Sequence, residues 1–202
     1  MRYGMILDLN RCYGCQACTI ICKQKNGTPP EVFWAKVETK EVGEYPNAHR
    51  EFKPLMCMHC ADAPCIEKCP TGASYKREDG VVLIDETLCI GCNYCIAACP
   101  YGARYFDYNE KRSYFPGMPE NSYEALQESN KPRVHIVSKC NLCTDRLAEG
   151  DIPACAQVCP TKARIFDTVD SIEFQKKLIE RNGYQDKAEL GTDPSVYYLP
   201  RK

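Results

Sequence analysis

Long hydrophobic runs are missing from this 202-residue chain. No apolar stretch approaches the roughly 18 residues that a membrane-spanning helix needs, so the sequence predicts no transmembrane segment. A charge imbalance is missing too: charged residues make up 26% of the chain and the net charge is -1. This balance excludes a disordered charged tail and a protein that binds nucleic acid by charge.

Export signals are also missing from the first ten residues, MRYGMILDLN. The apolar stretch there is too short for a secretory signal, and no pair of adjacent arginines is present. We therefore expect a cytoplasmic protein, or a passenger that crosses a membrane with a signal-bearing partner.

Cysteine, by contrast, is abundant, with 16 residues. The cysteines form four groups of four, and none is left over. The groups are Cys12, Cys15, Cys18 and Cys22; Cys57, Cys60, Cys65 and Cys69; Cys89, Cys92, Cys95 and Cys99; and Cys140, Cys143, Cys155 and Cys159. Groups one and three read C-x2-C-x2-C-x3-C, and the other two stretch only the middle gaps.

Three of the groups end alike, in Cys-Pro-x-x-Ala, which indicates a repeated supersecondary unit. Group one departs from this pattern, because Lys23 follows Cys22 where the others have proline. The spacing is typical of a 4Fe–4S cubane: one loop wraps three corners of the cluster, and its backbone N–H groups face the sulfurs. Gly14 and Gly91 precede a ligand, where a positive φ is easily tolerated.

Two other interpretations of the cysteines are weaker. Zinc prefers two separated C-x2-C pairs per ion, which the triplets fit poorly. Disulfides require Cβ vectors that face each other, and cysteines three apart on one loop seldom meet that requirement.

In two-cluster ferredoxins the fourth cysteine of a group ligates the other cluster. Groups two and three form one such module, the inserted module (50–105), with a hairpin of residues 73–76 and 81–85 turning at Asp79-Gly80. Groups one and four then pair across the sequence in a split module (1–30 plus 134–168), with residues 5–9 and 163–168 as outer strands.

Crossed ligation predicts four metal sites. Cluster 1 is held by Cys12, Cys15, Cys18 and Cys159; cluster 2 by Cys22, Cys140, Cys143 and Cys155; cluster 3 by Cys57, Cys60, Cys65 and Cys99; and cluster 4 by Cys69, Cys89, Cys92 and Cys95. The fold class expected is α+β: two intertwined bacterial ferredoxin-like modules with two 4Fe–4S clusters each, one module inserted in the other.

Every thiolate is used in this scheme, so no iron keeps an open position for substrate. We therefore expect no catalytic residues and no cofactor beyond the four 4Fe–4S clusters, and we expect the clusters to carry electrons. A free soluble polyferredoxin carrier and a catalytic iron–sulfur enzyme remain as alternatives.

Three cysteine-free segments complete the chain. Residues 32–39 and 41–45 alternate loosely, which predicts a half-exposed hairpin. Residues 106–138 are polar and irregular; we interpret 106–133 as an insertion that contacts a partner, with a mobile surface loop as the alternative and a short helix at 122–129.

Residues 169–202 form a C-terminal extension. Residues 170–173 resemble a capping box that opens a helix, and Gly183 is the expected C-cap. Phe174, Leu178 and Ile179 fall on one side of this helix, and residues 195–200 predict a strand. The simplest expectation is that this extension packs against the split module.

Polar side chains near the cysteines could tune the clusters. His59, inside the Cys57–Cys60 loop, could donate a hydrogen bond to a sulfur, but a ligand role is not expected. Several cations flank the groups, and for any single one a solvated charge is the simpler interpretation. They are Lys23, Lys68, Arg104, Lys139, Arg146, Lys162 and Arg164.

The motifs from DLNRCYGCQACTIICK to KCNLCTDRLAEGDIPACAQVCPTKARIFD span nearly the whole chain. In them the chain resembles the four-cluster iron–sulfur subunit of dimethyl sulfoxide reductase-family molybdopterin oxidoreductases. The stretches HC-x-x-x-PC-x-x-x-CPTGA and CPYGARY are especially similar to polysulfide, thiosulfate and arsenate reductase subunits.

The resemblance implies a line of clusters in the order 1, 2, 3, 4. Cluster 1 would lie nearest a molybdopterin (molybdenum or tungsten) catalytic subunit, and cluster 4 would face an integral membrane quinone-reacting subunit or a soluble donor or acceptor. It also implies a periplasmic location, peripheral to the membrane, reached by co-export with the catalytic subunit; a cytoplasmic enzyme is the alternative.

Overall fold

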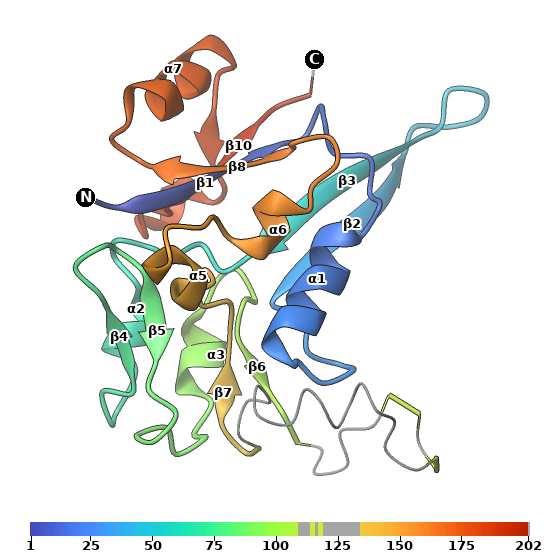
Figure 1. Ribbon diagram of the computed structural model, residues 1–202. Helices are drawn as coiled ribbons and strands as arrows, with labels where there is room; N and C mark the ends of the chain where they lie inside the picture. Colours follow the sequence, from blue (N-terminus) through green and yellow to red (C-terminus); the bar gives the residue numbers. More distant parts are fainter. Residues whose placement is uncertain (109–113, 116, 119–133, 202) are drawn as a thin grey trace.

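The computed structural model describes residues 1–108, 114–115, 117–118 and 134–201. Its largest sheet has the strand order β8-β1-β10-β9 (Figure 1). The strands are β1 (Tyr3–Asp8), β8 (Arg164–Thr168), β9 (Tyr184–Gln185) and β10 (Val196–Leu199). β8 runs antiparallel to β1, so the two segments expected as outer strands are strands and pair with each other. The N-terminal strand and the strand after the fourth cysteine group therefore meet in one sheet.

β1 has a core on each of its faces, because successive side chains of a strand point to opposite sides. Met5 and Leu7 belong to the large core that also contains most of the cysteines. Ile6 points the other way and packs with Phe174 and Leu199 in a smaller core. The sheet thus separates the cysteine-bearing body of the protein from its C-terminal layer.

Short helices accompany the cysteine groups on one side of this sheet (Figure 1). They are α1 (Ala17–Asn26), α2 (Pro64–Glu67), α3 (Tyr94–Ala98), α5 (Thr144–Ala148) and α6 (Ala154–Gln157). α1 packs against α6, and α2 packs against α3, so that groups one and four meet and groups two and three meet. The combination of helices and small sheets confirms the α+β class.

Two hairpins lie within the cysteine-bearing body. β4 (Ser74–Lys76) pairs with β5 (Val82–Ile84), which confirms the hairpin predicted between groups two and three. β6 (Tyr105–Phe106) pairs with β7 (Val137–Ser138) and joins the two ends of the 106–138 segment. The helix expected at 122–129 and most of the 106–133 insertion lie outside the described residues.

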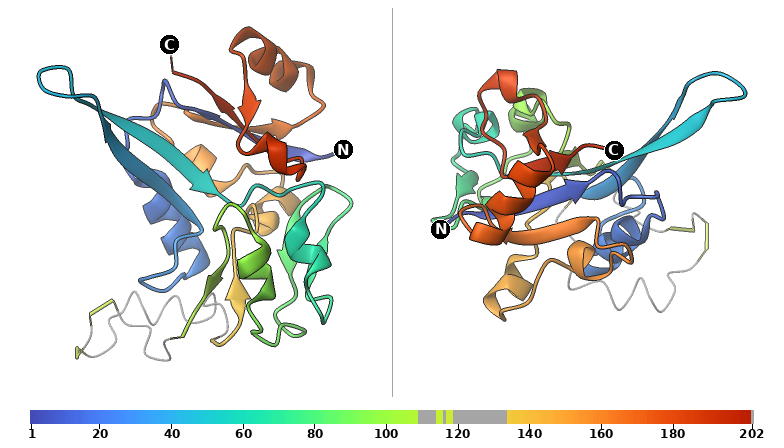
Figure 2. Two further views of the ribbon diagram at one scale, coloured as in Figure 1. Left: turned by 180° about the vertical axis from the view of Figure 1, so that it is seen from behind. Right: turned by 90° about the horizontal axis from the view of Figure 1, so that it is seen from above.

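The hairpin expected in residues 32–45 is wrong in its extent. β2 (Ala35–Val42) pairs with β3 (His49–Met56), and the turn lies between them at 43–48, not at residue 40. Gly43 has a φ of +87° in that turn, and the Asn47 N–H donates to the carbonyl of Glu44 over 2.7 Å. Figure 2 shows the far end of this hairpin projecting from the body.

The C-terminal layer is α7 (Ile172–Glu180) with the 3-10 helix η2 (Ala188–Leu190). The helix begins one residue later than the predicted capping box: Ser171, not Asp170, is the N-cap of α7 and accepts a hydrogen bond from the Phe174 N–H. Two further details of the prediction are wrong: Ile179 is 76% exposed, and Asn182, not Gly183, adopts the left-handed conformation after the helix. β10 runs parallel to β1, so the C-terminal extension packs against the N-terminal strand of the chain.

Hydropathy gives no membrane-crossing helix in the described part of the chain.

Candidate iron–sulfur sites

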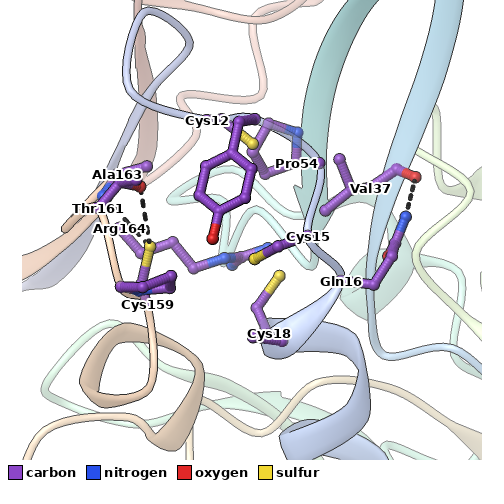
Figure 3. A pocket seen from close by; sticks show the side chains of 14 residues that line it. Cys12, Cys15, Gln16, Cys18, Val37, Pro54, Cys159, Thr161, Ala163 and Arg164 are labelled. Atoms are coloured by element: carbon purple, nitrogen blue, oxygen red, sulfur yellow. Dashed lines mark hydrogen bonds between the residues drawn. The ribbon is translucent and has the colours of Figure 1, made fainter.

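The first pocket is lined by four of the cysteines (Figure 3). Cys12 and Cys15 come from the loop before α1, Cys18 lies in the first turn of α1, and Cys159 comes from the loop after α6. The pocket encloses about 340 Å³, its open mouth included, and the four sulfur atoms are set apart around it (Figure 3). The structure therefore brings together the quartet predicted for cluster 1, which joins residues far apart in the sequence.

A second pocket, of about 300 Å³ with its mouth, is the counterpart in the other half of the molecule. Cys89 and Cys92 line it from the loop before α3, Cys95 lines it from the first turn of α3, and Cys69 lines it from the loop after α2. This is the quartet predicted for cluster 4.

The two C-x2-C-x2-C loops have nearly the same backbone. Gly14 and Gly91 have φ values of +77° and +70°. Two residues later, Gln16 and Asn93 have φ values of +61° and +63°. The positive φ predicted for the glycines is confirmed, and the agreement at the second position indicates one loop type used twice.

The remaining eight cysteines are more deeply buried and affect one another through charge. Burial, followed by Cys155 and Cys143, raises the pKa of Cys22 to about 12. Burial, followed by Cys57, raises the pKa of Cys60 to about 12, and Cys65 and Cys99 add to the rise. These neighbours are the members predicted for cluster 2 and for cluster 3.

The donors around the sulfurs fit anionic clusters. The Ser74 N–H donates to Cys69 Sγ over 3.4 Å, and the Ala163 N–H donates to Cys159 Sγ over 3.2 Å. Burial raises the pKa of Cys159, but hydrogen bonds from Arg164, Thr161 and Ala163 outweigh it, so that this pKa is lowered. Such donors stabilise thiolates, which are the form that ligates iron.

Two buried hydrogen-bond donors indicate that a further acceptor lies beside them. Among the described residues, neither Arg164 Nη2 nor His59 Nε2 has a hydrogen-bond partner. His59 Nδ1 accepts from the Val82 N–H over 3.1 Å, so Nε2 is the nitrogen that carries the proton. Buried donors are normally satisfied, and inorganic sulfide or a ligand thiolate beside them would accept these hydrogen bonds.

None of the sixteen cysteines forms a disulfide, which contradicts the disulfide alternative. The solvated-charge interpretation is also wrong for three cations. Arg104, Lys139 and Arg164 are 4%, 4% and 3% exposed. Lys68 and Lys162 are exposed, as that interpretation expected.

Sequence reasoning missed three side chains that touch the sulfurs or their neighbours. Asn26 Nδ2 donates to Cys22 Sγ over 3.5 Å. Ser74 Oγ accepts from Arg104. Thr192, from the C-terminal extension, supplies a hydrogen bond that lowers the pKa of Cys60 against the larger effect of burial. Only Ser74 has a sequence signal, since it stands five residues after Cys69 as Arg104 does after Cys99.

Comparison with known proteins identifies the class. Two family profiles, each described as a 4Fe-4S dicluster domain, match residues 48–114 and 88–163. A selenate reductase subunit from Mesobacillus selenatarsenatis is 40% identical over 98% of this chain and 72% of its own length.

Two further relatives match over nearly their whole lengths. The thiosulfate reductase electron transfer subunit of Salmonella typhi is 37% identical over 97% of this chain and 91% of its own. A polysulfide reductase chain from Wolinella succinogenes is 38% identical over 100% of this chain and 95% of its own length. The protein described here belongs to the family of iron–sulfur subunits of dimethyl sulfoxide reductase-type molybdopterin oxidoreductases.

Membership confirms the predicted resemblance. The two profiles show two tandem 4Fe–4S ferredoxin-type domains. The function of the chain is electron transfer, and it has no catalytic site of its own. The free-carrier alternative is not favoured, because the relatives are named as subunits.

Proposed function

We propose that the chain holds four 4Fe–4S clusters on crossed ligand quartets and conducts electrons along them. The quartets are those predicted for clusters 1 to 4. The convergence of Cys159 with the distant Cys12–Cys18 loop, and of Cys69 with the Cys89–Cys95 loop, supports the crossing. The bound clusters supply one-electron redox chemistry; the protein fixes their positions, excludes water and places donors on their sulfurs.

The proposed order 1, 2, 3, 4 is supported by which cysteines affect each other. Cys155, of cluster 2, has its pKa raised by burial and then by Cys18, of cluster 1, against Arg164. Cys140, of cluster 2, has its pKa raised by burial, by its own quartet and by Cys57, of cluster 3. Cys65 and Cys95, of clusters 3 and 4, share the neighbour Arg104.

The solvent exposure of the cysteine ligands is the observation that best supports electron transfer along a line of four clusters. All four ligands of cluster 2 are buried, as are three ligands of cluster 3. The outer quartets each have one exposed ligand, Cys15 and Cys92. Exposed apolar side chains flank both: Tyr13 is 53% exposed, Ile90 67% and Tyr94 63%. Electrons would thus enter and leave at the two ends, where partners can approach.

The partner at the cluster 1 end would be a molybdopterin subunit that contains molybdenum or tungsten. At the cluster 4 end we propose an integral membrane quinone-reacting subunit or a soluble donor or acceptor. The relatives are named as subunits of selenate, thiosulfate and polysulfide reductases, which supports a catalytic partner. We propose a periplasmic location reached by co-export with that partner; a cytoplasmic complex is the second candidate.

Iron content tests the crossed ligation. The anaerobically purified chain should carry about sixteen iron atoms, four for each cubane. Cys15→Ser and Cys159→Ser should disturb the same cluster, so the double variant should lose no more iron than the worse single variant. Cys15→Ser combined with Cys155→Ser should disturb two clusters and lose about twice as much, up to roughly eight atoms.

Uncrossed ligation predicts that both double variants lose about twice as much iron, because Cys15 would then share a cluster with neither Cys155 nor Cys159. That outcome, or an iron content far below sixteen in the unaltered chain, would overturn the proposal. Molybdenum and tungsten analysis of the protein that co-purifies with the chain tests the partner.

A further inference from the structure

Two buried arginines occupy equivalent places in the sequence. Arg104 stands five residues after Cys99, and Arg164 stands five residues after Cys159. Both end a Cys-Pro-x-x-Ala-Arg stretch. Arginine is almost never fully buried without a charged partner, yet these two are only 4% and 3% exposed. Their burial therefore requires a compensating charge.

Arg104 lies between the ligands of clusters 3 and 4. Its Nη2 donates to Cys65 Sγ over 3.0 Å, and its Nη1 donates to Ser74 Oγ over 2.8 Å. Burial raises the pKa of Cys95, and the charge and hydrogen bond of Arg104 oppose that rise. One guanidinium thus acts on a ligand of each cluster.

Arg164 occupies the same position between clusters 1 and 2. It lines the cluster 1 pocket, into which its side chain extends (Figure 3). Its Nη1 lies 3.8 Å from Cys155 Sγ, of cluster 2, and 3.4 Å from Met56 Sδ. Burial lowers the pKa of Arg164, but Cys155 and Cys18 outweigh it, so that the pKa is raised. Cys18 and Cys155 belong to different quartets.

Among the described residues, the side-chain hydrogen bonds of both guanidinium groups go to sulfur or hydroxyl groups, and no carboxylate pairs with either. A buried cation without a counter-charge costs several kcal/mol. Anionic thiolate-ligated clusters on both sides would supply the missing negative charge.

We propose that Arg104 and Arg164 are bridging positioning residues, each of which sets the reduction potentials of both clusters of its own module. This rests on the proposed function, because it needs two clusters beside each arginine. Reduction adds one electron to a cubane, taken from the donor that reduces the chain, and makes the cubane more negative. The guanidinium keeps its proton throughout, so no proton moves, and its fixed positive charge favours the reduced form of either neighbour.

The test is a potentiometric titration with dithionite, followed by electron paramagnetic resonance, on the iron-loaded chain in its complex. Arg164→Gln should lower the equilibrium constant for reducing clusters 1 and 2 at least tenfold, about 59 mV for one electron, and leave clusters 3 and 4 unchanged. Arg104→Gln should lower the equilibrium constant for reducing clusters 3 and 4 by a similar factor and leave clusters 1 and 2 unchanged. The Cys15→Ser and Cys155→Ser variants identify which signals belong to which quartet.

Two controls separate charge from packing. Arg164→Lys and Arg104→Lys keep the positive charge and should restore most of the potential. Lys162→Asn removes an equal charge two residues from Arg164, but Lys162 is exposed, so solvent should screen it and the potentials should stay near those of the unaltered chain.

Three results would overturn the inference: no shift in a fully iron-loaded Gln variant, a shift confined to one cluster, or an equal shift in Lys162→Asn. If a Gln variant fails to assemble its clusters, the Lys variant decides. Full iron with near-normal potentials supports the role of charge, and loss of iron in the Lys variant as well shows a purely structural role. Low iron in the unaltered chain would overturn the proposed function instead, so the two failures are distinguishable.

Discussion

The split and inserted modules share the spacing C-x2-C-x2-C-x3-C, but the chain continues differently after the fourth cysteine. In the inserted module, α3 ends at Ala98, and Cys99, before Pro100, is extended with φ -82° and ψ 109°. In the split module, Lys23 follows Cys22, and α1 continues to Asn26. Proline disfavours the helical conformation in the residue before it and cannot continue a helix, which explains the difference.

The longer helix provides for Cys22 what the proline-containing loops provide elsewhere. Backbone N–H groups after the proline donate to Cys69 and Cys159. At Cys22 the donor is the side chain of Asn26, one helical turn later. Lys23 Nζ also donates to the carbonyls of Pro29 and Val32, over 2.7 and 2.9 Å, and holds the next loop against the helix. The fourth cysteine of a group is thus supported by a helix in group one and by a loop in groups two and four.

Lys23→Pro imposes the loop of one module on the other, and we expect the largest effect from it. The substitution should break α1 before Asn26 can reach Cys22, at a cost of about 3 kcal/mol or more. Thermal unfolding and iron content measure the loss. Lys23→Gln is the matched control: it removes the bonds to the two carbonyls but keeps the helix, so it should cost less. Equal stability of the two variants would show that the helix is not what supports Cys22.

The sequence predicts this contrast only in part. Lys23 is visible as a departure from the repeat, and the outer strands, the 73–85 hairpin and the quartets follow from spacing and turn residues. The consequence of Lys23 is not predictable, because the Asn26 contact depends on a helix whose length no local pattern fixes. The burial of Arg104 and Arg164 escapes prediction for a related reason: each is surrounded by residues from several distant segments.

The two ligand loops also differ in how closely their glycines are packed, because a Cβ added at each glycine would contact a different neighbour. A Cβ at Gly91 would lie 2.4 Å from the backbone oxygen of His135, which cannot easily move. A Cβ at Gly14 would lie 2.3 Å from the ring of Phe52, a side chain that can turn away. Gly102 also has a positive φ, of +58°, but nothing lies within 4 Å of the added atom.

We therefore expect the stability loss to fall in the order Gly91→Ala, Gly14→Ala, Gly102→Ala. Gly102→Ala should cost about 1 kcal/mol from its backbone conformation alone, and Gly91→Ala two to three times that, roughly 2–3 kcal/mol. Denaturant unfolding of the iron-loaded chain measures all three. If Gly102→Ala costs as much as Gly91→Ala, backbone strain and not crowding limits these loops.

The smallest expected effect concerns the threonines after Cys-Pro. The hydroxyl of Thr161 lies 3.7 Å from Cys159 Sγ, and that of Thr71 lies 3.8 Å from Cys69 Sγ. Each hydroxyl stabilises the thiolate, so Thr161→Val should lower the potential of cluster 1, and Thr71→Val that of cluster 4. At these long distances we expect about 0.5 kcal/mol or less for each, the lower end for a hydrogen bond.

The surroundings of the two terminal cysteines should make these small shifts unequal. Cys159 has Arg164 within its own pocket, while no arginine lines the pocket of Cys69 in the described part of the chain. Arg164 donates its backbone N–H to Cys159, and its guanidinium opposes the rise that burial causes in the pKa of Cys12, in the same pocket. We therefore expect the loss of a hydroxyl to matter less at Cys159 than at Cys69. Potentiometric titration should therefore show a smaller shift for Thr161→Val than for Thr71→Val.

Thr87→Val is the control for these two variants, because the Thr87 hydroxyl donates to Asp85 over 2.6 Å and not to a sulfur. It should leave all four potentials unchanged. A larger shift for Thr161→Val than for Thr71→Val would contradict the expected order, because the arginine would then not substitute for the hydroxyl. The difference between the modules at this position would in that case come from the hydroxyl contact itself and not from the charge beside it.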